Sequence, residues 1–274
     1  MSYWLDVNAG RGQRQGGPVK DAVVVQVGCG GTGSFLAEAV CRLLMGRDAD
    51  LYVVDLDRVE RHNVGRQAFD PADVGQFKAQ VLAERLARRF GRTVGYAVQP
   101  YDAGLHSRIF RAQPSRLNLL IGAVDNADAR RALAATLDGR LDVLWLDCGN
   151  GRNSGQVLLG NATRAGHLRG AFHPEQGICT ALPAPSLQRP DLLEAPPTPL
   201  PRLDCAEAIA EEQQGATINQ VVAAVAASYV ERLLDGTCRS MGSYVDMDTG
   251  MLRTFPIEPT AVASASRIHR FQVP

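Results

Sequence analysis

Short apolar runs alternate with amphipathic segments over the first half of this chain. The first run, 22–27 (A-V-V-V-Q-V), is rich in β-branched residues and has the length of a strand buried on both faces. Further strands are predicted at 51–54, 94–98, 118–124, 143–146 and 156–160, and helices at 34–45, 77–90 and 127–137. This alternation predicts an α/β fold with a doubly wound, mostly parallel sheet.

The character of the chain changes after residue 166. Seven of the fifteen prolines lie between Pro183 and Pro201, with few apolar anchors, so 166–205 is predicted to be a mobile Pro-rich crossover segment. A long apolar helix at 217–234 and a β-hairpin at 243–255, turning at 248–250, are predicted to follow.

These patterns predict a chain divided into four parts. Residues 1–20 lack periodicity and are expected to be a flexible N-terminal lead-in, and 21–165 form a Rossmann-like half. The crossover segment 166–205 separates that half from 206–274, where the helix and hairpin are expected to complete the same domain as an antiparallel C-terminal extension.

Composition and charge narrow the function classes. Lys plus Arg and Asp plus Glu are balanced at 29 each, which argues against a nucleic-acid partner. The longest apolar run, Val221–Val230, is about half of the roughly 20 residues that a membrane span needs. No secretory signal is recognisable at the N-terminus, and six scattered cysteines without a C-x-x-C pair favour a reducing compartment. We therefore expect a cytoplasmic protein with no membrane partner.

A glycine-rich turn follows the first predicted strand. Residues 28–33 read G-C-G-G-T-G, which fits G-x-G-x-x-G with Gly28, Gly30 and Gly33 at the fixed positions. Such glycines permit a tight turn and let phosphates approach the N-terminus of the next helix. Asp55 follows Gly33 by 22 residues, where an acid that binds a ribose is expected. The alternative is a glycine turn that binds nothing.

Polar residues crowd the loop 55–67, D-L-D-R-V-E-R-H-N-V-G-R-Q, directly after the strand 51–54. An acid at the end of a strand suits a sugar hydroxyl or a metal, and Arg66, eleven positions after Asp55, suits a phosphate. A solvated loop with ordinary charges would have a similar composition.

Two more positions carry candidate chemistry. Lys78 lies in the first turn of the helix 77–90, where the helix dipole disfavours a cation unless an anion is bound, although a solvated lysine would also be possible there. Asp125 and Asn126 end the strand 118–124. Either of them could simply cap the next helix, or they could face the same crevice as Gly28 and Asp55.

The loop 55–67 matches D-x-D-x-V-x-x-x-N-x-x-R-Q at every fixed position. With the 28–33 turn before it and G-Q-F-K at 75–78 after it, the chain resembles the ubiquitin-activating-enzyme-like family, the ThiF, MoeB and HesA group. The likeness runs from about Val23 to Pro259 and is greatest to the ThiF-related proteins of bacterial plasmid (PRTRC-type) cassettes. It implies a Rossmann-like ThiF fold.

The resemblance also implies an ATP-dependent adenylyltransferase. Its substrate would be the C-terminal carboxylate of a small ubiquitin-like β-grasp protein, and its products an acyl-adenylate and pyrophosphate. A carboxylate is already ionised near neutral pH, so no general base is required. The residues implied to bind ATP are Gly28, Gly30, Gly31, Gly33, Asp55, Asp57, Asn63, Arg66, Gln67, Lys78, Asp125 and Asn126. Among them Asp55 would bind the ribose, Asn63, Arg66 and Lys78 the triphosphate, and Asp125 the Mg²⁺. Arg66, Lys78 and Asp125 are the catalytic candidates in this set.

In many members of the family a cysteine then takes the acyl group. Cys205, in the block D-C-A-E-A at 204–208, stands where that cysteine would be, although related enzymes keep a cysteine there without using it. Cys179 is the second candidate. We interpret Cys29, Cys41 and Cys148 as small buried hydrophobic residues.

The chain departs from the family pattern in two ways. Paired C-x-x-C motifs are absent, so no structural zinc is expected. The N-terminal R-Y-x-R-Q stretch, which reaches the ATP of a dimer partner, is missing, and only Arg11 and Arg14 are basic upstream of the first predicted strand apart from Lys20 at its edge. A homodimer is still expected from the resemblance.

Two other functions remain open. An NAD(P)-dependent oxidoreductase would explain the glycine turn and Asp55, but not Asn63, Arg66, Gln67 and Lys78. A nucleotide-binding or partner-binding module that has lost its chemistry would explain the missing N-terminal arginine.

Overall fold

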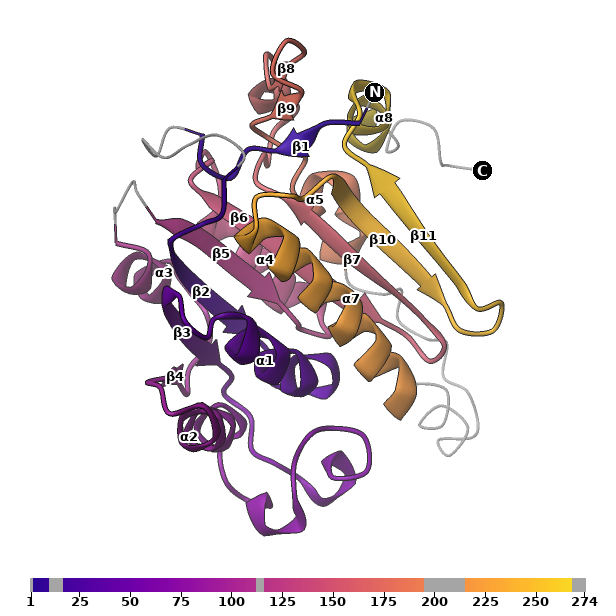
Figure 1. The fold of residues 1–274 in the computed structure, drawn as a ribbon. Helices are drawn as coiled ribbons and strands as arrows, with labels where there is room; N and C mark the ends of the chain where they lie inside the picture. Colours follow the sequence, from indigo (N-terminus) through magenta and orange to yellow (C-terminus); the bar gives the residue numbers. More distant parts are fainter. Residues whose placement is uncertain (1, 10–16, 112–115, 195–214, 268–274) are drawn as a thin grey trace.

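An eight-stranded sheet runs through the computed structural model, which describes residues 2–9, 17–111, 116–194 and 215–267 (Figure 1). Its strand order is β11-β10-β7-β6-β5-β2-β3-β4, and the five strands from β6 to β4 are parallel. β7, β10 and β11 join antiparallel at the other edge. The strands are β2 (Asp21–Val27), β3 (Asp48–Val54), β4 (Gly95–Ala97), β5 (Leu117–Gly122), β6 (Val143–Asn150), β7 (Ser154–Gly160), β10 (Ser240–Asp246) and β11 (Met251–Pro256). The predicted doubly wound fold with an antiparallel C-terminal extension is confirmed.

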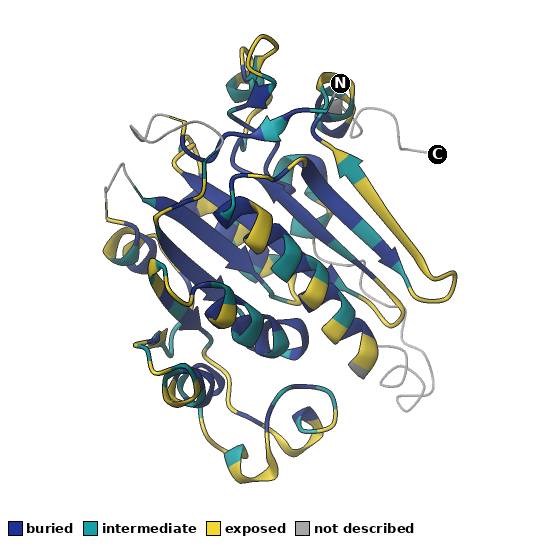
Figure 2. Cartoon of the chain, viewed as in Figure 1, coloured by how far each residue is buried: buried dark blue, intermediate teal, exposed yellow. Residues whose placement is uncertain are grey.

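Helices cover both faces of this sheet. One face packs against α1 (Gly31–Leu43), α2 (Lys78–Phe90) and α7 (Ala216–Leu234), and the other against α3 (Ala103–Ile109) and α4 (Ala127–Thr136). Smaller helices are α5 (Pro185–Gln188), α8 (Pro259–Arg267), η1 (Arg61–Asn63), η2 (Pro71–Asp73), η3 (Ala165–Leu168) and η4 (Pro190–Leu193). Because both faces are covered, the central parallel strands β2, β5 and β6 are buried almost throughout, as their continuous apolar runs predict (Figure 2).

The order of the strands creates a crevice beside β2. The chain passes outward from β2 to β3 and β4, and then crosses back to place β5 on the opposite side of β2. The connections after β2 and β5 therefore leave in opposite directions, and ligands of open α/β sheets bind at such a switch point, outside the carboxyl ends of the strands. The glycine turn and Asp125 both lie at this point.

The N-terminal residues differ from the prediction of a flexible lead-in. β1 (Trp4–Leu5) pairs in parallel with β9 (Ile178–Cys179), and β8 (Phe172–His173) completes a three-stranded sheet. Tyr3, Leu5 and Val7 are buried, and the Leu5 N–H donates to the Cys238 carbonyl. The prediction is wrong for residues 2–9, because three alternating apolar residues are too short a pattern to separate from a loop.

The proposed mobile crossover segment is also wrong over 166–194. Ile178, Cys179, Ala181, Leu182 and Ala184 are buried there. The buried Gln188 amide donates to the carbonyls of Leu159 and Pro183, which fastens α5 to β7. The rest of the predicted segment, 195–205, lies outside the described residues.

No helix among the described residues is both long and apolar enough to cross a membrane.

We expect truncation of Leu5 to destabilise the protein, because its side chain is 2% exposed and packs in the larger core. Leu5→Ala should lower the free energy of unfolding by about 2–4 kcal/mol, measured by urea denaturation. Leu252→Ala on β11 is the matched control, since Leu252 is 56% exposed, and should change it by less than about 0.5 kcal/mol. Equal effects of the two substitutions would contradict the packed N-terminus.

Candidate functional site

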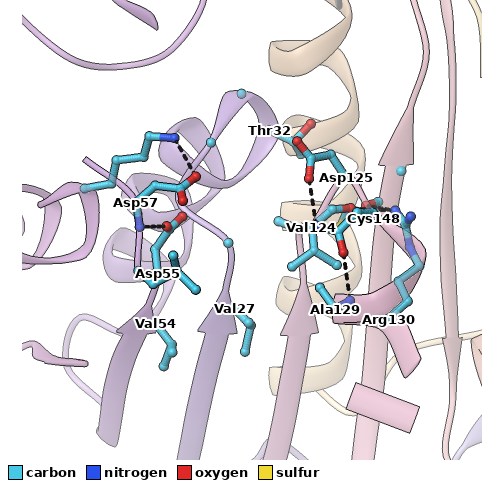
Figure 3. Close-up of a pocket in the computed structure, with 18 of the residues that line it drawn as sticks. Val27, Thr32, Val54, Asp55, Asp57, Val124, Asp125, Ala129, Arg130 and Cys148 are labelled. Atoms are coloured by element: carbon cyan, nitrogen blue, oxygen red, sulfur yellow. Dashed lines mark hydrogen bonds and ion pairs between the residues drawn. The ribbon is translucent and has the colours of Figure 1, made fainter. Parts of the chain in front are cut away.

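A cavity of about 790 Å³ opens at the carboxyl ends of β2, β3, β5 and β6 (Figure 3). This volume is within the range of ligand pockets, roughly 300–1,000 Å³. Of the residues predicted to bind nucleotide, all except Gly33 line the cavity: Gly28, Gly30, Gly31, Asp55, Asp57, Asn63, Arg66, Gln67, Lys78, Asp125 and Asn126. Three separate segments of the chain are thus brought together around one space.

The glycine turn is shaped by close contact with β5. Gly28 has φ +97°, and a Cβ atom there would lie 2.3 Å from the Ala123 carbonyl oxygen. A Cβ at Gly33 would lie 2.1 Å from the Gly28 carbonyl oxygen, so a side chain at position 33 would clash with the start of the turn. The buried Gln26 amide, which the sequence did not single out, donates to the carbonyls of Gly28 and Gly33 at 3.0 and 2.8 Å. The turn leads into the N-terminus of α1, at the edge of the cavity.

Asp55 is held in one orientation at the end of β3. Its Oδ2 accepts the Cys29 N–H at 2.6 Å, and its Oδ1 accepts the Asp57 N–H at 2.8 Å. Burial raises the pKa of Asp55 above its ordinary value, and the two backbone hydrogen bonds oppose that rise. The carboxylate therefore connects the glycine turn to the loop 55–67, and its remaining lone pairs are acceptors at the cavity wall.

Lys78 is not a solvated helix-end lysine. Its side chain is 9% exposed, and Nζ lies 3.2 Å from the Asp57 carboxylate at the edge of the cavity. Asp57, which is 58% exposed at its side chain, is therefore an ion-pair partner of Lys78 in this structure. The pair keeps the ammonium group extended from the first turn of α2 toward the cavity.

Backbone hydrogen bonds centred on Asn63 shape the loop. The Asn63 Oδ1 accepts the Glu60 N–H at 2.9 Å, and its carbonyl accepts the N–H groups of Arg66 and Gln67. Gln67 is 6% exposed and lines the cavity, yet its Oε1 has no hydrogen-bond partner among the described residues. Asn63 thus orders the loop that carries Arg66 and Gln67, in addition to lining the cavity itself.

Asn126 is the N-cap of α4, as one of the two interpretations predicts. Its Oδ1 accepts the Ala129 N–H at 2.8 Å, while its Nδ2 lies 3.3 Å from Asp125 Oδ1. Asp125 is exposed at the cavity mouth, across the glycine turn from Asp55 (Figure 3). Capping and lining of the cavity are therefore compatible at this turn.

A buried ion pair beneath the cavity was missed at the sequence level. Arg130 Nε lies 3.2 and 3.3 Å from the two carboxylate oxygens of Asp147, which is fully buried. Arg130 Nη2 donates to the Val124 carbonyl at 2.6 Å. Burial raises the pKa of Asp147, and the guanidinium opposes this. The pair ties the ends of β5 and β6 together under Asp125. Two features of the sequence could have revealed this pair. Asp147 directly follows the apolar strand 143–146, and Arg130 lies four residues after the helix cap Asn126.

Tyr101 and His106 form a second buried polar contact at the wall. The Tyr101 hydroxyl lies 2.8 Å from His106 Nδ1, and Tyr101 lines the cavity. Burial, with a smaller effect of Arg140, lowers the pKa of His106 to about 4. The imidazole is therefore neutral near pH 7, and Nδ1 can accept the Tyr101 hydroxyl proton.

The described cysteines are unsuited to nucleophilic chemistry. Cys29, Cys41 and Cys148 are buried, as predicted. Cys179 is also buried, its thiol donates to the Ala181 carbonyl, and burial raises its pKa to about 11. The second candidate for an acyl-accepting thiol is therefore wrong, because thiolate and access are both missing. Cys205, Arg11 and Arg14 lie outside the described residues.

Among the residues that the structure describes, no group of three or more His, Cys, Asp or Glu side chains is arranged to hold a metal ion.

A glycine turn at the switch point of a doubly wound sheet, with an acid at the end of the next strand, defines a Rossmann-like fold. The family comparison is more specific. The model of the ThiF family matches residues 12–262, and the chain belongs to this family of E1-like adenylating enzymes.

Sequence relatives include ubiquitin-like modifier-activating enzyme 5 of several animals. The Xenopus laevis protein is 31% identical over 153 residues, which is 52% of this chain and 37% of that protein. The Gallus gallus protein is 30% identical over 155 residues, with the same two coverages. The chain thus spans little more than a third of the length of these relatives.

Solved structures with the same fold include PaaA, with a TM-score of 0.59, 14% identity, and coverage of 88% of this chain and 74% of PaaA. Escherichia coli MccB with MccA-N7isoASN has a TM-score of 0.57 at 16% identity, and the match covers 90% of this chain and 67% of that chain. MccB with ATP has a TM-score of 0.55 at 16% identity, and the match covers 87% of this chain and 64% of that chain. At these identities the likeness establishes the fold.

The buried His106 predicts a specific loss of stability in acid. Its pKa is about 4 in the folded protein and near 6.5 when unfolded, so the stabilisation is present above pH 6.5 and is lost as the pH falls toward 4. His106→Asn keeps an acceptor for Tyr101 without titrating. Between pH 7 and 4.5 we expect the free energy of unfolding of this variant to fall by about 2–3 kcal/mol less than that of the wild type, and its melting temperature by about 4–12 °C less.

The exposed His173 is the control for this measurement, and His173→Asn should show the wild-type pH dependence. An identical pH dependence of the melting temperature in His106→Asn and the wild type would contradict the assignment.

Proposed function

We propose that this protein is an ATP-dependent adenylyltransferase that activates the C-terminal carboxylate of a small ubiquitin-like β-grasp protein. The observation that carries the proposal is the convergence of three segments on one cavity. The glycine turn, the loop from Asp55 to Gln67 with Lys78, and the Asp125 turn all face it. In this proposal the turn and the N-terminus of α1 hold the phosphates, and Asp55 accepts a hydrogen bond from the ribose.

The charges around the cavity suit a triphosphate. ATP carries about four negative charges, which must be balanced before a carboxylate can approach the α-phosphorus. Lys78 and Arg66 line the cavity, and the positive end of α1 faces it. A ligand phosphate would compete with Asp57 for the Lys78 ammonium, at a site where the side chain is already buried. We assign triphosphate contacts to Lys78, Arg66 and Asn63.

Asp125 has the chemistry that Mg²⁺ requires. Mg²⁺ in nucleotide sites is held by one or two carboxylates together with phosphate oxygens and water, so a single exposed carboxylate at the mouth is a suitable donor. The bound ion would neutralise charge on the phosphates. Asn126 lies against Asp125 and caps α4, and it would keep that carboxylate directed at the cavity mouth.

The reaction follows from this arrangement. A carboxylate oxygen of the acceptor attacks the α-phosphorus, the bond from that phosphorus to the bridging oxygen breaks, and pyrophosphate leaves with the electron pair. The chain's own residues position the triphosphate and stabilise the charge that develops, since the carboxylate nucleophile needs no base. Arg66 and Lys78 would act on the transition state in this way.

The relatives support ATP as the cosubstrate and a ubiquitin-like protein as the acceptor. MccB has been solved with ATP and with MccA, and the curated relatives are activating enzymes of a ubiquitin-like modifier. From the same resemblance we further propose that the chain belongs to the subgroup of bacterial plasmid cassettes and acts as a homodimer. The Cys205 thiolate would then attack the acyl carbon of the adenylate, and a thioester would form as the bond to the phosphate oxygen breaks and AMP leaves. A binding module of the same fold without chemistry is the alternative.

The class of ligand is tested by melting temperature. ATP with Mg²⁺ at about 100 times its dissociation constant should raise the melting temperature by about 5–10 °C, because the ligand binds only the folded state. NAD at the same concentration should not raise it, since the cavity offers Arg66 and Lys78 for a triphosphate. A shift with NAD and none with ATP would refute the proposal.

Substitution of Lys78 or Asp125 should slow adenylate formation without unfolding the protein. With ATP, Mg²⁺ and the candidate β-grasp protein, intact mass spectrometry should detect the acyl-adenylate. Lys78→Ala and Asp125→Ala should each slow its formation by about 10²–10³-fold. Lys20→Ala replaces the only other lysine, and Asp248→Ala replaces an exposed acid of the β10–β11 hairpin, so both controls should retain wild-type rates. Adenylate formation that survives both site substitutions unchanged would refute the site assignment.

The same spectra test the role of Cys205. A thioester on Cys205 requires a covalent adduct between the two proteins that disappears in Cys205→Ala, while adenylate formation continues. If the adduct persists in Cys205→Ala, this thiol is not the acyl acceptor.

A further inference from the structure

A fully buried asparagine near the start of α7 connects three segments around the cavity. Asn219 Nδ2 donates to the Arg66 carbonyl oxygen at 3.3 Å. Its Oδ1 accepts the Asn150 Nδ2 at 3.0 Å and lies 3.4 Å from the Thr32 hydroxyl. The Thr32 hydroxyl in turn donates to Asn150 Oδ1 at 2.9 Å. One amide therefore joins the loop that carries Arg66, the first turn of α1 and the end of β6.

The packing of this amide explains a glycine that the backbone does not require. Gly31 begins α1, and its φ is not positive. A Cβ atom at Gly31 would nevertheless lie 2.4 Å from Asn219 Oδ1 and 2.6 Å from its Cγ. α1 and α7 lie side by side in Figure 1, and here they approach so closely that the asparagine occupies the place of the missing side chain. The amide is thus confined as well as hydrogen-bonded.

The bonds of Asn219 reach the two segments that carry the groups proposed to hold phosphate. Thr32 and Gly31 belong to the N-terminal turn of α1, and Arg66 is one of the two cationic side chains assigned to the triphosphate. Any buried amide requires hydrogen-bond partners, and those of Asn219 are residues that line the cavity. Asp55, which is proposed to bind the ribose, and Tyr101 have no hydrogen bond to this cluster among those described.

We propose that Asn219 is a positioning residue for triphosphate binding, which holds the peptide of Arg66 in register with the N-terminal turn of α1. The inference rests on the proposed function and adds a residue from the C-terminal part of the chain to the site. Loss of this link loosens the Arg66 loop relative to the α1 turn, although the Ala68 N–H still donates to the Ser34 hydroxyl of α1 at 2.9 Å. Affinity for the phosphates then falls, while the wall that faces the nucleoside is unchanged.

The experiment compares two ligands on the same variant. Isothermal titration calorimetry is performed with ATP plus Mg²⁺ and separately with adenosine, on the wild type and on Asn219→Ala. We expect the affinity for ATP to fall about tenfold and that for adenosine to change less than about twofold. The ratio of the two affinities is insensitive to partial unfolding, because an unfolded fraction lowers both apparent affinities equally.

Asn161→Ala is the matched control. Asn161 is likewise buried, its Nδ2 donates to the Leu141 carbonyl and its Oδ1 accepts the Leu182 N–H. Neither of these partners lines the cavity, whereas the partners of Asn219 do. Its substitution should leave the ratio of the ATP and adenosine affinities unchanged. Asn150→Ala removes the Asn150 side of the cluster. Because Asn150 is half-buried, this substitution carries less risk to folding, and it should also lower the ratio of the ATP affinity to the adenosine affinity.

An unchanged affinity ratio in both Asn219→Ala and Asn150→Ala overturns the inference, as does an equal loss for ATP and adenosine, which would indicate a structural role only. These results are distinct from a failure of the proposed function. In that case the wild type itself binds no ATP, and the inference is overturned with it.

Discussion

The close approach of the Gly28 turn to the end of β5 is the constraint on which the site depends. β2 and β5 are neighbours whose following connections leave in opposite directions, and the Ala123 N–H donates to the Val27 carbonyl where they separate. The backbone at Gly28 then passes so near the Ala123 carbonyl that no side chain can be accommodated. This contact sets the distance between the glycine turn and Asp125, so every later feature of the cavity is placed relative to it.

Buried polar groups hold the loops around that contact. Gln26 bonds both ends of the glycine turn, Arg130 and Asp147 join β5 to β6, and Asn219 joins the Arg66 loop to α1. A buried polar group without a partner destabilises a fold, so each of these side chains restricts its loop to the arrangement in which its bonds are made. The cavity is therefore surrounded by loops with little freedom, and pre-organised donors and cations are what charge stabilisation in a transition state requires.

Prediction succeeded where residues were close in the chain and periodic. The strand ending at Asp55, the helix that begins at Lys78 and the cap at Asn126 follow local rules, and the structure has all three. α1 begins at Gly31, three residues earlier than predicted, because tertiary contacts of Gly31 and Thr32 compensate for the poor helix propensity of glycine. The N-terminal strand and the packed part of 166–194 were missed because their partners, such as Cys238 for Leu5, are distant in sequence.

The sequence by itself determined the alternating α/β architecture, the glycine turn and the candidate polar residues of the 55–67 loop, Lys78 and Asp125, since each depends on spacing within one or two elements. Only the tertiary structure decided how those residues are used. It made Asp57 the partner of Lys78, gave Asn63 a role in ordering its loop, and buried Cys179 beyond the reach of a substrate. It also brought Asn219 to Arg66 across more than one hundred and fifty residues of chain. Contacts of this kind are set by the packing of helices across the sheet, and no local pattern specifies which side chains will meet there.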